Sequence, residues 1–554
     1  MHMNIEVEKF KCIFTAHKAT MESDDSEEIM NNKRYLKESY DAVIIGGALA
    51  GCASALTLAK KGLNVLVAEQ HNLPGGVATS FVRGGVEIEA SLHEMMSIGP
   101  KECPLKIRNF FDEMGVDIEW LRVPEAYRFV DDETGTDALV HPGTHGNFET
   151  PAHEIAQACG DTDGSLFHKI LDLLNLCHRV YNSVNILSVT KMSKPMMLAK
   201  HPDFVKTAGY SAKEVIDTFG LPKKAVDILS AYWIYVGDTL DNLPFTIWAV
   251  LMADYLGYGS YIPKKFSHEM SLKMAERAME MGVQMEFGLR ADKILVENGH
   301  VKGVRFANGE EVKSDYVICS AYPDKAYTSM IEPAEAVPEG AFKFVNAKTL
   351  GVSCFSVVML LDESPEALGI HDYSTFYAPK GMHLNQIFEE YAGEGPYNYI
   401  TSICTNLANP DASPEGTCIY SITALPRPEG WLNVNEENYE EMTRKNAEYF
   451  IDQESKRLGV NLRDHILEIV YETPVSVAHF TGAYRGSIYG YMHTMDDHIV
   501  ARLQMSESEN YIQGLSFAGA HQISGDGMGP AVTNGRKAAK IILDMMAEDG
   551  KEIA

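Results

Sequence analysis

The segment 41–69 narrows the possible folds of this 554-residue chain more than any other feature. Apolar stretches at 41–45 (DAVII) and 64–68 (NVLVA) indicate two short strands. Between them lie the glycine-rich turn 46–51 (GGALAG) and a helical stretch at 52–61 (CASALTLAKK). This order is the layout of a βαβ unit that holds a dinucleotide, with the pyrophosphate over the helix N-terminus. The segment therefore predicts an α/β fold that opens with half of a dinucleotide site.

The same layout indicates which residues contact the dinucleotide. Glu69 ends the second strand 23 residues after Gly46, where an acid binds ribose hydroxyls. A glycine pair follows, and it can bring backbone amides close to phosphates. One departure is Ala48, whose methyl group stands at the second position of the G-x-G-x-x-G pattern. The alternative, a glycine-bearing turn of an ordinary α/β protein, is less consistent with the flanking strands. The predicted contacts are Gly46, Gly47, Ala48, Gly51, Glu69, Gly75 and Gly76.

A second glycine-rich run, 514–540 (GLSFAGAHQISGDGMGPAVTNGRKAAK), lies near the other end of the chain. It indicates a strand, a glycine turn and a closing helix. A cofactor held by both ends of a chain suggests FAD rather than a freely exchanging nicotinamide. The positive N-terminal end of the closing helix would lie near the flavin ring, where reduction places negative charge. A plain glycine-rich turn is the alternative. The predicted contacts here are Gly519, Asp526, Gly527 and Met528.

The pattern of helical and strand-like stretches in the rest of the chain predicts a discontinuous cofactor domain. A doubly wound FAD-binding domain is expected from residues 40–120, 255–330 and 484–545. An α+β substrate domain is expected from residues 121–254 and 331–483, and residues 1–39 form an N-terminal extension. Asn-Gly pairs at 298–299 and 308–309 predict hairpins, and residues 439–458 predict a helix.

Composition excludes several classes of protein. The net charge of −29 makes a nucleic-acid-binding face improbable, so no nucleic-acid partner is expected. The nine cysteines include no C-x-x-C pair and no ligand spacing with histidine, which favours a reducing compartment and no metal. No signal-peptide pattern and no membrane-spanning apolar run is evident. A cytoplasmic protein is therefore expected.

Several stretches together resemble the phytoene desaturase, carotenoid isomerase and retinol saturase family of flavoproteins. The match spans most of residues 40–545, and three substitutions depart from it: Ala48, Ser91 for a glycine, and the loss of two glycines at 262–266 (IPKKF). The stretch from Glu69 to His93 is most similar to the retinol saturase branch. The stretches that carry the resemblance are 69–71 (EQH), 75–76 (GG), 89–93 (EASLH), 292–299 (DKILVENG), 320–323 (SAYP), 409–416 (NPDASPEG), 473–474 (TP), 486–490 (GSIYG), 517–520 (FAGA) and 525–529 (GDGMG).

The resemblance implies tightly bound FAD and two further cofactor contacts, Gln70 and Ala291. It also places His93 in the segment that lies against the isoalloxazine. Flavin would carry out the redox chemistry while the protein orients the reactants. His93 and His521 are the candidate catalytic residues, because imidazole can exchange protons near neutral pH. A hydrogen-bonded structural histidine is the alternative for each. Glu94 and Tyr489 are weaker candidates, with Glu94 expected to be solvated.

The expected function is FAD-dependent saturation or desaturation of a C–C or C=C bond in a lipophilic unsaturated substrate, with saturation slightly preferred. The substrate is a polyene, isoprenoid or fatty-acyl-like molecule, and the electron donor or acceptor is unknown. One alternative is a redox-neutral flavin-dependent double-bond isomerase. Another is a flavin-free prenyl chaperone of the same fold, against which Glu69 and the Gly75–Gly76 pair argue. An amine oxidase is a further possibility without a supporting aromatic pattern.

Two apolar segments fit a lipophilic substrate. Residues 243–256 (LPFTIWAVLMADYL) predict a core helix or the wall of a hydrophobic tunnel. Residues 192–198 (MSKPMML), flanked by Lys191 and Lys200, predict a peripheral contact with a membrane surface. The protein is therefore expected to associate with membranes without spanning them.

Overall fold

The computed structural model describes residues 35–188, 190, 192–499, 502, 511–522, 524–525 and 527–551. Its first layer is a sheet of five parallel strands in the order β20–β13–β1–β2–β9. Strands β1 and β2 are buried along their whole length, as expected for a parallel sheet that is covered on both faces. The strands are β1 (Ala42–Ile45), β2 (Val65–Ala68), β9 (Gln284–Glu286), β13 (Val317–Cys319) and β20 (Leu515–Phe517).

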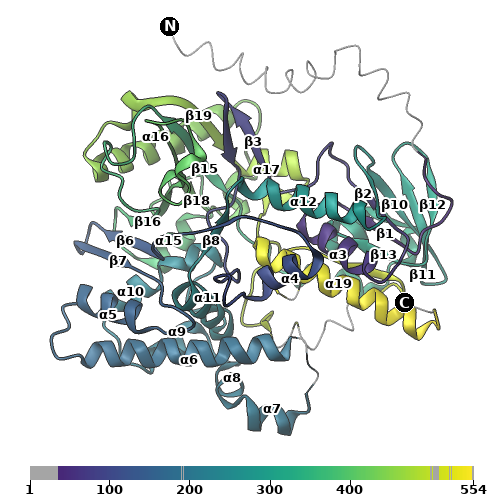
Figure 1. Cartoon of the computed structure of the whole chain (residues 1–554), viewed down its shortest axis with the longest axis horizontal. Helices are drawn as coiled ribbons and strands as arrows, with labels where there is room; N and C mark the ends of the chain where they lie inside the picture. Colours follow the sequence, from purple (N-terminus) through teal and green to yellow (C-terminus); the bar gives the residue numbers. More distant parts are fainter. Residues whose placement is uncertain are drawn as a thin grey trace.

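The two faces of this sheet are covered differently. Ala42 and Ile44 point to a layer of helices, whereas Val43 and Ile45 point to a second, smaller sheet. Figure 1 shows the helical layer with α3 and α19 adjacent, although they come from opposite ends of the chain. The helices are α3 (Leu49–Ala59), α4 (Lys106–Met114), α12 (Phe266–Glu280) and α19 (Met528–Glu548). The predicted α/β class is confirmed.

The smaller sheet contains the predicted hairpins. β10 (Ala291–Glu297) pairs antiparallel with β11 (His300–Phe306), which pairs with β12 (Glu311–Lys313). Asn298 and Gly299 have φ angles of 51° and 78°, the left-handed conformation that a two-residue hairpin turn requires. The strand order is β12–β11–β10–β14, with β14 at Ile331–Glu332.

A seven-stranded sheet forms the second half of the molecule, in the order β19–β15–β18–β17–β16–β6–β7. It is antiparallel except where β16 meets β6. Helix α16 (Tyr439–Leu458) has the bounds that the sequence predicts. The strands are β6 (Tyr127–Asp131), β7 (Thr136–Val140), β15 (Phe355–Leu361), β16 (Ser374–Ala378), β17 (Ile400–Cys404), β18 (Cys418–Ala424) and β19 (Ile466–Glu472).

A helical layer packs against this sheet in one large hydrophobic core. One of these helices ends at Leu229, and a 3₁₀ turn follows it. The Ser230 hydroxyl donates to the Val226 carbonyl at 2.6 Å, a local bond that competes with continued helix. The helices and the 3₁₀ turn are α5 (Glu149–Ala158), α6 (Ser165–Leu187), α7 (Lys194–Lys200), α8 (Pro202–Thr207), α9 (Ala212–Asp217), α10 (Lys223–Leu229), η1 (Ala231–Tyr235) and α11 (Phe245–Tyr258).

The parallel sheet takes its strands from three distant parts of the chain. These parts lie within the three ranges proposed for the cofactor domain, whose boundaries stay a prediction. Short elements connect the halves: hairpin β3 (Ser80–Arg83) with β4 (Val86–Glu89), and the pair β5 (Trp120–Arg122) with β8 (Tyr261–Pro263). The remaining helices are α13 (Pro323–Lys325), α14 (Glu339–Asn346), α15 (Leu384–Glu390) and α17 (Pro474–Thr481).

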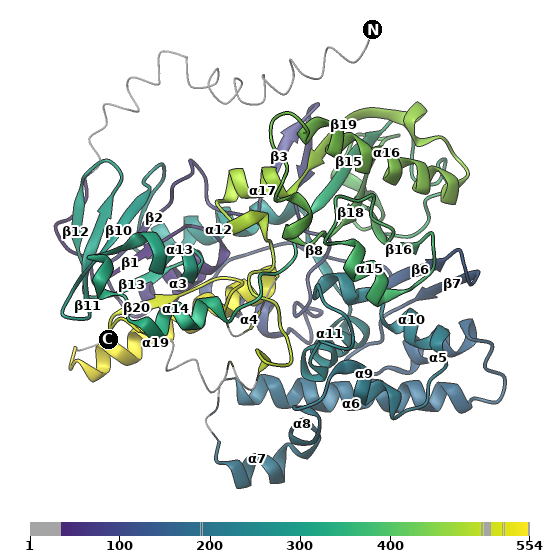
Figure 2. The ribbon, with the colours of Figure 1, turned by 180° about the vertical axis from the view of Figure 1, so that it is seen from behind.

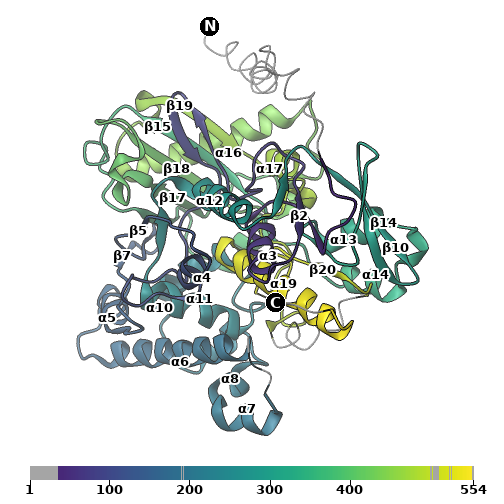
Figure 3. The same cartoon turned by 45° about the vertical axis from the view of Figure 1, so that its right-hand side comes forward.

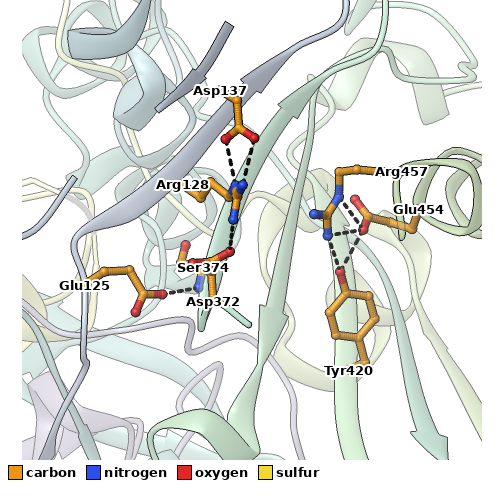
Figure 4. Close-up of polar contacts among 8 residues, drawn as sticks. All are labelled: Glu125, Arg128, Asp137, Asp372, Ser374, Tyr420, Glu454 and Arg457. Carbon is orange, nitrogen blue, oxygen red and sulfur yellow. Dashed lines mark hydrogen bonds and ion pairs between the residues drawn. The ribbon is translucent and has the colours of Figure 1, made fainter. Parts of the chain in front are cut away.

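Two polar clusters stabilise the seven-stranded sheet (Figure 4). In the first, Arg128 of β6 forms a bidentate pair with Asp137 of β7 and a further bond to Asp372, which precedes β16. In the second, Glu454 of α16 accepts from Arg457 at 2.6 Å and from the Tyr420 hydroxyl of β18 at 2.7 Å. The second cluster joins the helix to the sheet through a buried charge pair.

We expect Glu454→Ala to lower the free energy of unfolding by about 3–5 kcal/mol, because the Arg457 guanidinium would stay buried without its carboxylate. Glu448→Ala, on the same helix, is the matched control. Its carboxylate pairs with Arg463 at the surface, so its loss should cost less than about 1 kcal/mol. Urea unfolding followed by circular dichroism measures both. Equal effects of the two variants would contradict this account of the buried pair.

Candidate functional site

A cavity of about 670 Å³ opens at the carboxyl ends of the parallel strands. In open α/β sheets this edge is where ligands bind, and the volume lies in the usual range for ligand pockets. Residues that follow β1, β2, β13 and β20 line one side. Residues of η1, α11 and the seven-stranded sheet also line the cavity, so it lies between the two halves of the molecule. Figure 2 shows these halves, with the parallel sheet on one side and the seven-stranded sheet on the other.

Most predicted site residues line this cavity. Gly47 and Gly51 are not among the lining residues, so their role as cofactor contacts stays a prediction. A Cβ on Gly51 would lie 1.9 Å from the Gly46 carbonyl oxygen, so this glycine allows α3 to start close to the turn. Asp526 lies outside the described residues. The predicted residues that line the cavity are Gly46, Ala48, Glu69, Gln70, Gly75, Gly76, His93, Ala291, Gly519, His521, Gly527 and Met528.

Ala48 is accommodated by the glycine pair opposite it. A Cβ on Gly76 would lie 3.0 Å from the Ala48 methyl group, so the missing side chain at 76 makes room for the methyl at 48. Ala48 is also the N-cap of α3, and no side chain caps this helix start. Its free N–H groups therefore face the cavity, as an anion-binding turn requires.

The Glu69 carboxylate is fixed by two backbone groups. The Gly47 N–H donates to Oε2 at 2.6 Å and the His71 N–H donates to Oε1 at 2.8 Å. Each oxygen keeps a second lone pair for a ribose hydroxyl. Positive side chains, Arg290 and Lys293, line the same part of the cavity, which suits a phosphorylated ligand.

Asn534 of α19 holds the C-terminal glycine run, although no local pattern marks this asparagine. Its amide donates to the carbonyls of Gly519 at 2.8 Å and Gly525 at 3.2 Å. Its oxygen accepts from the Ser524 N–H at 3.0 Å. Three bonds from one buried side chain therefore shape the turn that leads into α19, whose N-terminus faces the cavity.

In the cavity wall His521 is buried and His93 is half-buried. Burial lowers the pKa of His93 to about 4. Burial, with a contribution from the Arg502 charge, lowers the pKa of His521 to about 3. Both imidazoles are therefore neutral at pH 7. Among the described residues His521 Nε2 has no hydrogen-bond partner, so it is available to a ligand in the cavity.

His93 leads into a row of polar groups that come from different strands. Its Nε2 lies 3.2 Å from Thr423 Oγ1, which lies 2.7 Å from Ser356 Oγ. Cys354 Sγ follows at 3.3 Å from Ser356 Oγ and 3.7 Å from an oxygen of Glu472. Nothing in the local sequence marks these residues, because only the pairing of β15 with β18 and β19 brings them together.

Glu94 was expected to be solvated, and the structure corrects this. Its side chain is 6% exposed and lines the cavity beside His93. The Tyr235 hydroxyl donates to Oε1 at 3.2 Å, and the Ser260 hydroxyl donates to Oε2 at 2.9 Å. Burial raises the pKa of Glu94 to about 8. A neutral carboxyl therefore stands at this end of the cavity at pH 7.

The residues fit a bound dinucleotide. The uncapped start of α3 offers N–H groups to phosphates, the oriented Glu69 carboxylate offers acceptors to ribose hydroxyls, and the unpartnered His521 nitrogen offers a further polar contact.

Within the described part of the chain, no group of three or more His, Cys, Asp or Glu is placed to hold a metal ion. No helix in that part is long and apolar enough to cross a membrane.

The chain is similar to proteins that act on carotenoids and retinoids. It is 24% identical over 475 residues to prolycopene isomerase 1 of an Oncidium hybrid cultivar, which covers 82% of this chain and 76% of that protein. It is 24% identical over 372 residues to the all-trans-retinol 13,14-reductase of Rattus norvegicus, 64% of this chain and 59% of the relative. The predicted resemblance is therefore confirmed.

The fold also matches a solved structure, a putrescine oxidase bound to putrescine. The TM-score is 0.61 at 12% identity, over 91% of this chain and 99% of that chain. The family model of flavin-containing amine oxidoreductases matches residues 49–543. The chain therefore belongs to the flavin-containing amine oxidoreductase family.

Proposed function

We propose that the protein is an FAD-dependent oxidoreductase that saturates or desaturates a C–C or C=C bond of a lipophilic unsaturated substrate. The observation that carries the proposal is one continuous cavity, which runs from the start of α3 and Glu69 to an apolar end beside His93. When bound, FAD supplies hydride transfer. The relatives that act on prolycopene and on all-trans-retinol support the substrate class.

In this proposal each part of the cavity has a distinct task. The start of α3 and the Gly75–Gly76 pair bind the phosphates, and Glu69 orients the ribose. The N-terminus of α19 and His521 face the ring system. The apolar end excludes water and holds the substrate chain against the ring. The side chains that form this end include Leu92, Ile234, Tyr235, Leu251, Tyr255, Leu425, Ile488 and Tyr489.

A redox-neutral double-bond isomerase is the second candidate, favoured by the prolycopene isomerases among the relatives. Anaerobic photoreduction of the purified flavoprotein, followed by reoxidation with a panel of polyenes and enoates, distinguishes the two. A saturase reoxidises its flavin and yields a product heavier by two hydrogens. An isomerase leaves the flavin reduced and yields a product of unchanged mass.

We expect the purified protein to release non-covalent FAD on heating, identified by chromatography. Glu69→Ala should weaken FAD binding by about 1–3 kcal/mol, because the ribose hydroxyls and the Gly47 N–H lose their acceptor. Glu335→Ala, which changes an exposed acid that does not line the cavity, is the control and should keep its FAD. Release of FMN, or no flavin in wild type, would refute the cofactor assignment.

We propose His93 as the proton-transfer residue. Its neutral ring can accept a proton on one nitrogen while its other nitrogen, Nε2, hydrogen-bonds to the Thr423 hydroxyl. His93→Gln should lower turnover by roughly 10²–10⁴-fold. FAD content and melting temperature should change little. Lost stability with unchanged turnover per bound flavin would instead assign a structural role to this histidine.

We also propose that α7 and α8 contact anionic membranes. They project from the body of the molecule beneath α6 (Figure 3). Met196 and Leu198 are 48% and 58% exposed, and Ile186, Val205 and Tyr210 add further exposed apolar surface. Residues 186–211 hold four lysines and one acid, against a net charge of −29 for the whole chain. Exposed apolar groups among lysines are typical of interfacial helices.

Met196→Glu combined with Leu198→Glu should remove most co-sedimentation with vesicles that contain anionic lipid. Leu432→Glu combined with Leu467→Glu is the matched control, since these leucines are 50% and 55% exposed elsewhere. The control should sediment like wild type, and added salt should weaken wild-type binding. Equal sedimentation of wild type and the first variant would remove the claim.

A further inference from the structure

The apolar end of the cavity contains a carboxyl group, Glu94, that the proposed function does not use. Both of its oxygens are engaged by hydroxyl groups, Tyr235 at 3.2 Å and Ser260 at 2.9 Å. These hydroxyls can donate to the carboxyl oxygens. When Glu94 is protonated, its own O–H is then left for an acceptor inside the cavity.

Among the described residues, the recorded partners of Glu94 include no positively charged side chain. The 3₁₀ turn η1 contributes Tyr232 and Tyr235, helix α11 contributes Tyr255, and the start of β16 contributes Tyr373. Glu125 adds a like charge, and the neighbouring His93 is neutral. In the described part of the chain, the lysine and arginine residues that line the cavity are Arg290, which precedes β10, Lys293 in β10 and Lys325 in α13.

An ionised end group would be poorly tolerated here. A substrate carboxylate would meet a carboxyl group and no cation, and a desolvated charge without a partner is costly. An ammonium would require Glu94 to ionise in a buried setting, which burial disfavours. An alcohol or carbonyl oxygen would instead accept the Glu94 proton in a hydrogen bond without creating charge.

We infer that Glu94 selects lipophilic substrates that carry an uncharged oxygen, an alcohol or a carbonyl, at one end. This inference rests on the proposed function and narrows its substrate class. Glu94 acts as a hydrogen-bond donor that fixes which end of the substrate enters first. An elongated hydrocarbon lacking oxygen would leave this donor without an acceptor.

Three probes test the inference: geraniol, geranylamine and geranate share one isoprenoid chain and differ in head group. Isothermal calorimetry on the holoprotein gives their dissociation constants well below and well above pH 8, the region where Glu94 titrates. Below it, geraniol should bind about tenfold or more tightly than either charged probe. Above it, geraniol should lose affinity and geranylamine should gain it, because Glu94 becomes an anion.

Two substitutions isolate the carboxyl group. Glu94→Gln keeps a hydrogen-bond donor but cannot ionise, so geraniol should still be preferred, with no change across pH 8. Glu94→Leu should bind geraniol no better than the corresponding terpene hydrocarbon. Difference infrared spectra give a readout that needs no ligand: the protonated carboxyl band lost on raising the pH should be weaker in Glu94→Gln than in wild type.

The inference is overturned if geranylamine binds more tightly than geraniol below pH 8, since Glu94 would then be an anionic amine site. It is also overturned if Glu94→Leu keeps the wild-type preference. If Glu94→Leu fails to fold, the pH response and the infrared spectrum of Glu94→Gln test whether the Glu94 carboxyl group selects the head group. These binding measurements need no turnover, so an absent redox reaction in the holoprotein defeats the proposed function separately.

Discussion

The close contact between α3 and α19 is the constraint on which the rest of the site depends. A Cβ on Gly535 would lie 2.1 Å from the Ala50 carbonyl oxygen, so the two helices meet at backbone distance. The Ser54 hydroxyl lies 2.9 Å from the Ala50 carbonyl and 2.8 Å from the Gly535 carbonyl and can donate to both. This contact brings the N-terminal and C-terminal glycine turns to the same edge of the sheet, where neither would form a cofactor site alone.

The opposite side of the cavity depends on a second fixed point. The buried Asp254 carboxylate of α11 accepts the Ser97 N–H at 2.9 Å and also binds the Ser97 hydroxyl. Ser97 has a φ of 65°, a conformation that this pair of bonds stabilises. The segment that carries His93 and Glu94 is thereby held against α11, the helix that the sequence predicted as a core helix or the wall of a tunnel.

Local patterns predicted the cofactor half of the molecule well. The strand–turn–helix order at 41–69 and the Asn298–Gly299 turn follow from short-range rules, and the structure has them, as it has the helix predicted at 439–458 in the other half. Gly51 also has a packing role that the motif does not reveal, because a Cβ there would meet the Gly46 carbonyl oxygen; its role as a cofactor contact stays a prediction. Asn534 gave no signal, because an asparagine inside a helix is unremarkable until its loop partners are known.

The substrate end was less predictable for a related reason. Thr423, Ser356, Cys354 and Glu472 form one row only after β15 pairs with β18 and β19, and pairing across such distances leaves no periodic trace in the sequence. Glu94 was misjudged because a glutamate is usually solvated. Its burial depends on Tyr235 and Ser260, which are distant in sequence.

The strand order β20–β13–β1–β2–β9 has a consequence for how the chain matures. The edge strand β20 and helix α19 are translated after every other part of the sheet, and β20 pairs with β13. During synthesis the flavin site therefore stays incomplete while some two hundred residues between β13 and β20 emerge and fold. Pairings between such distant segments form slowly, so cofactor capture is a late event that closes the fold.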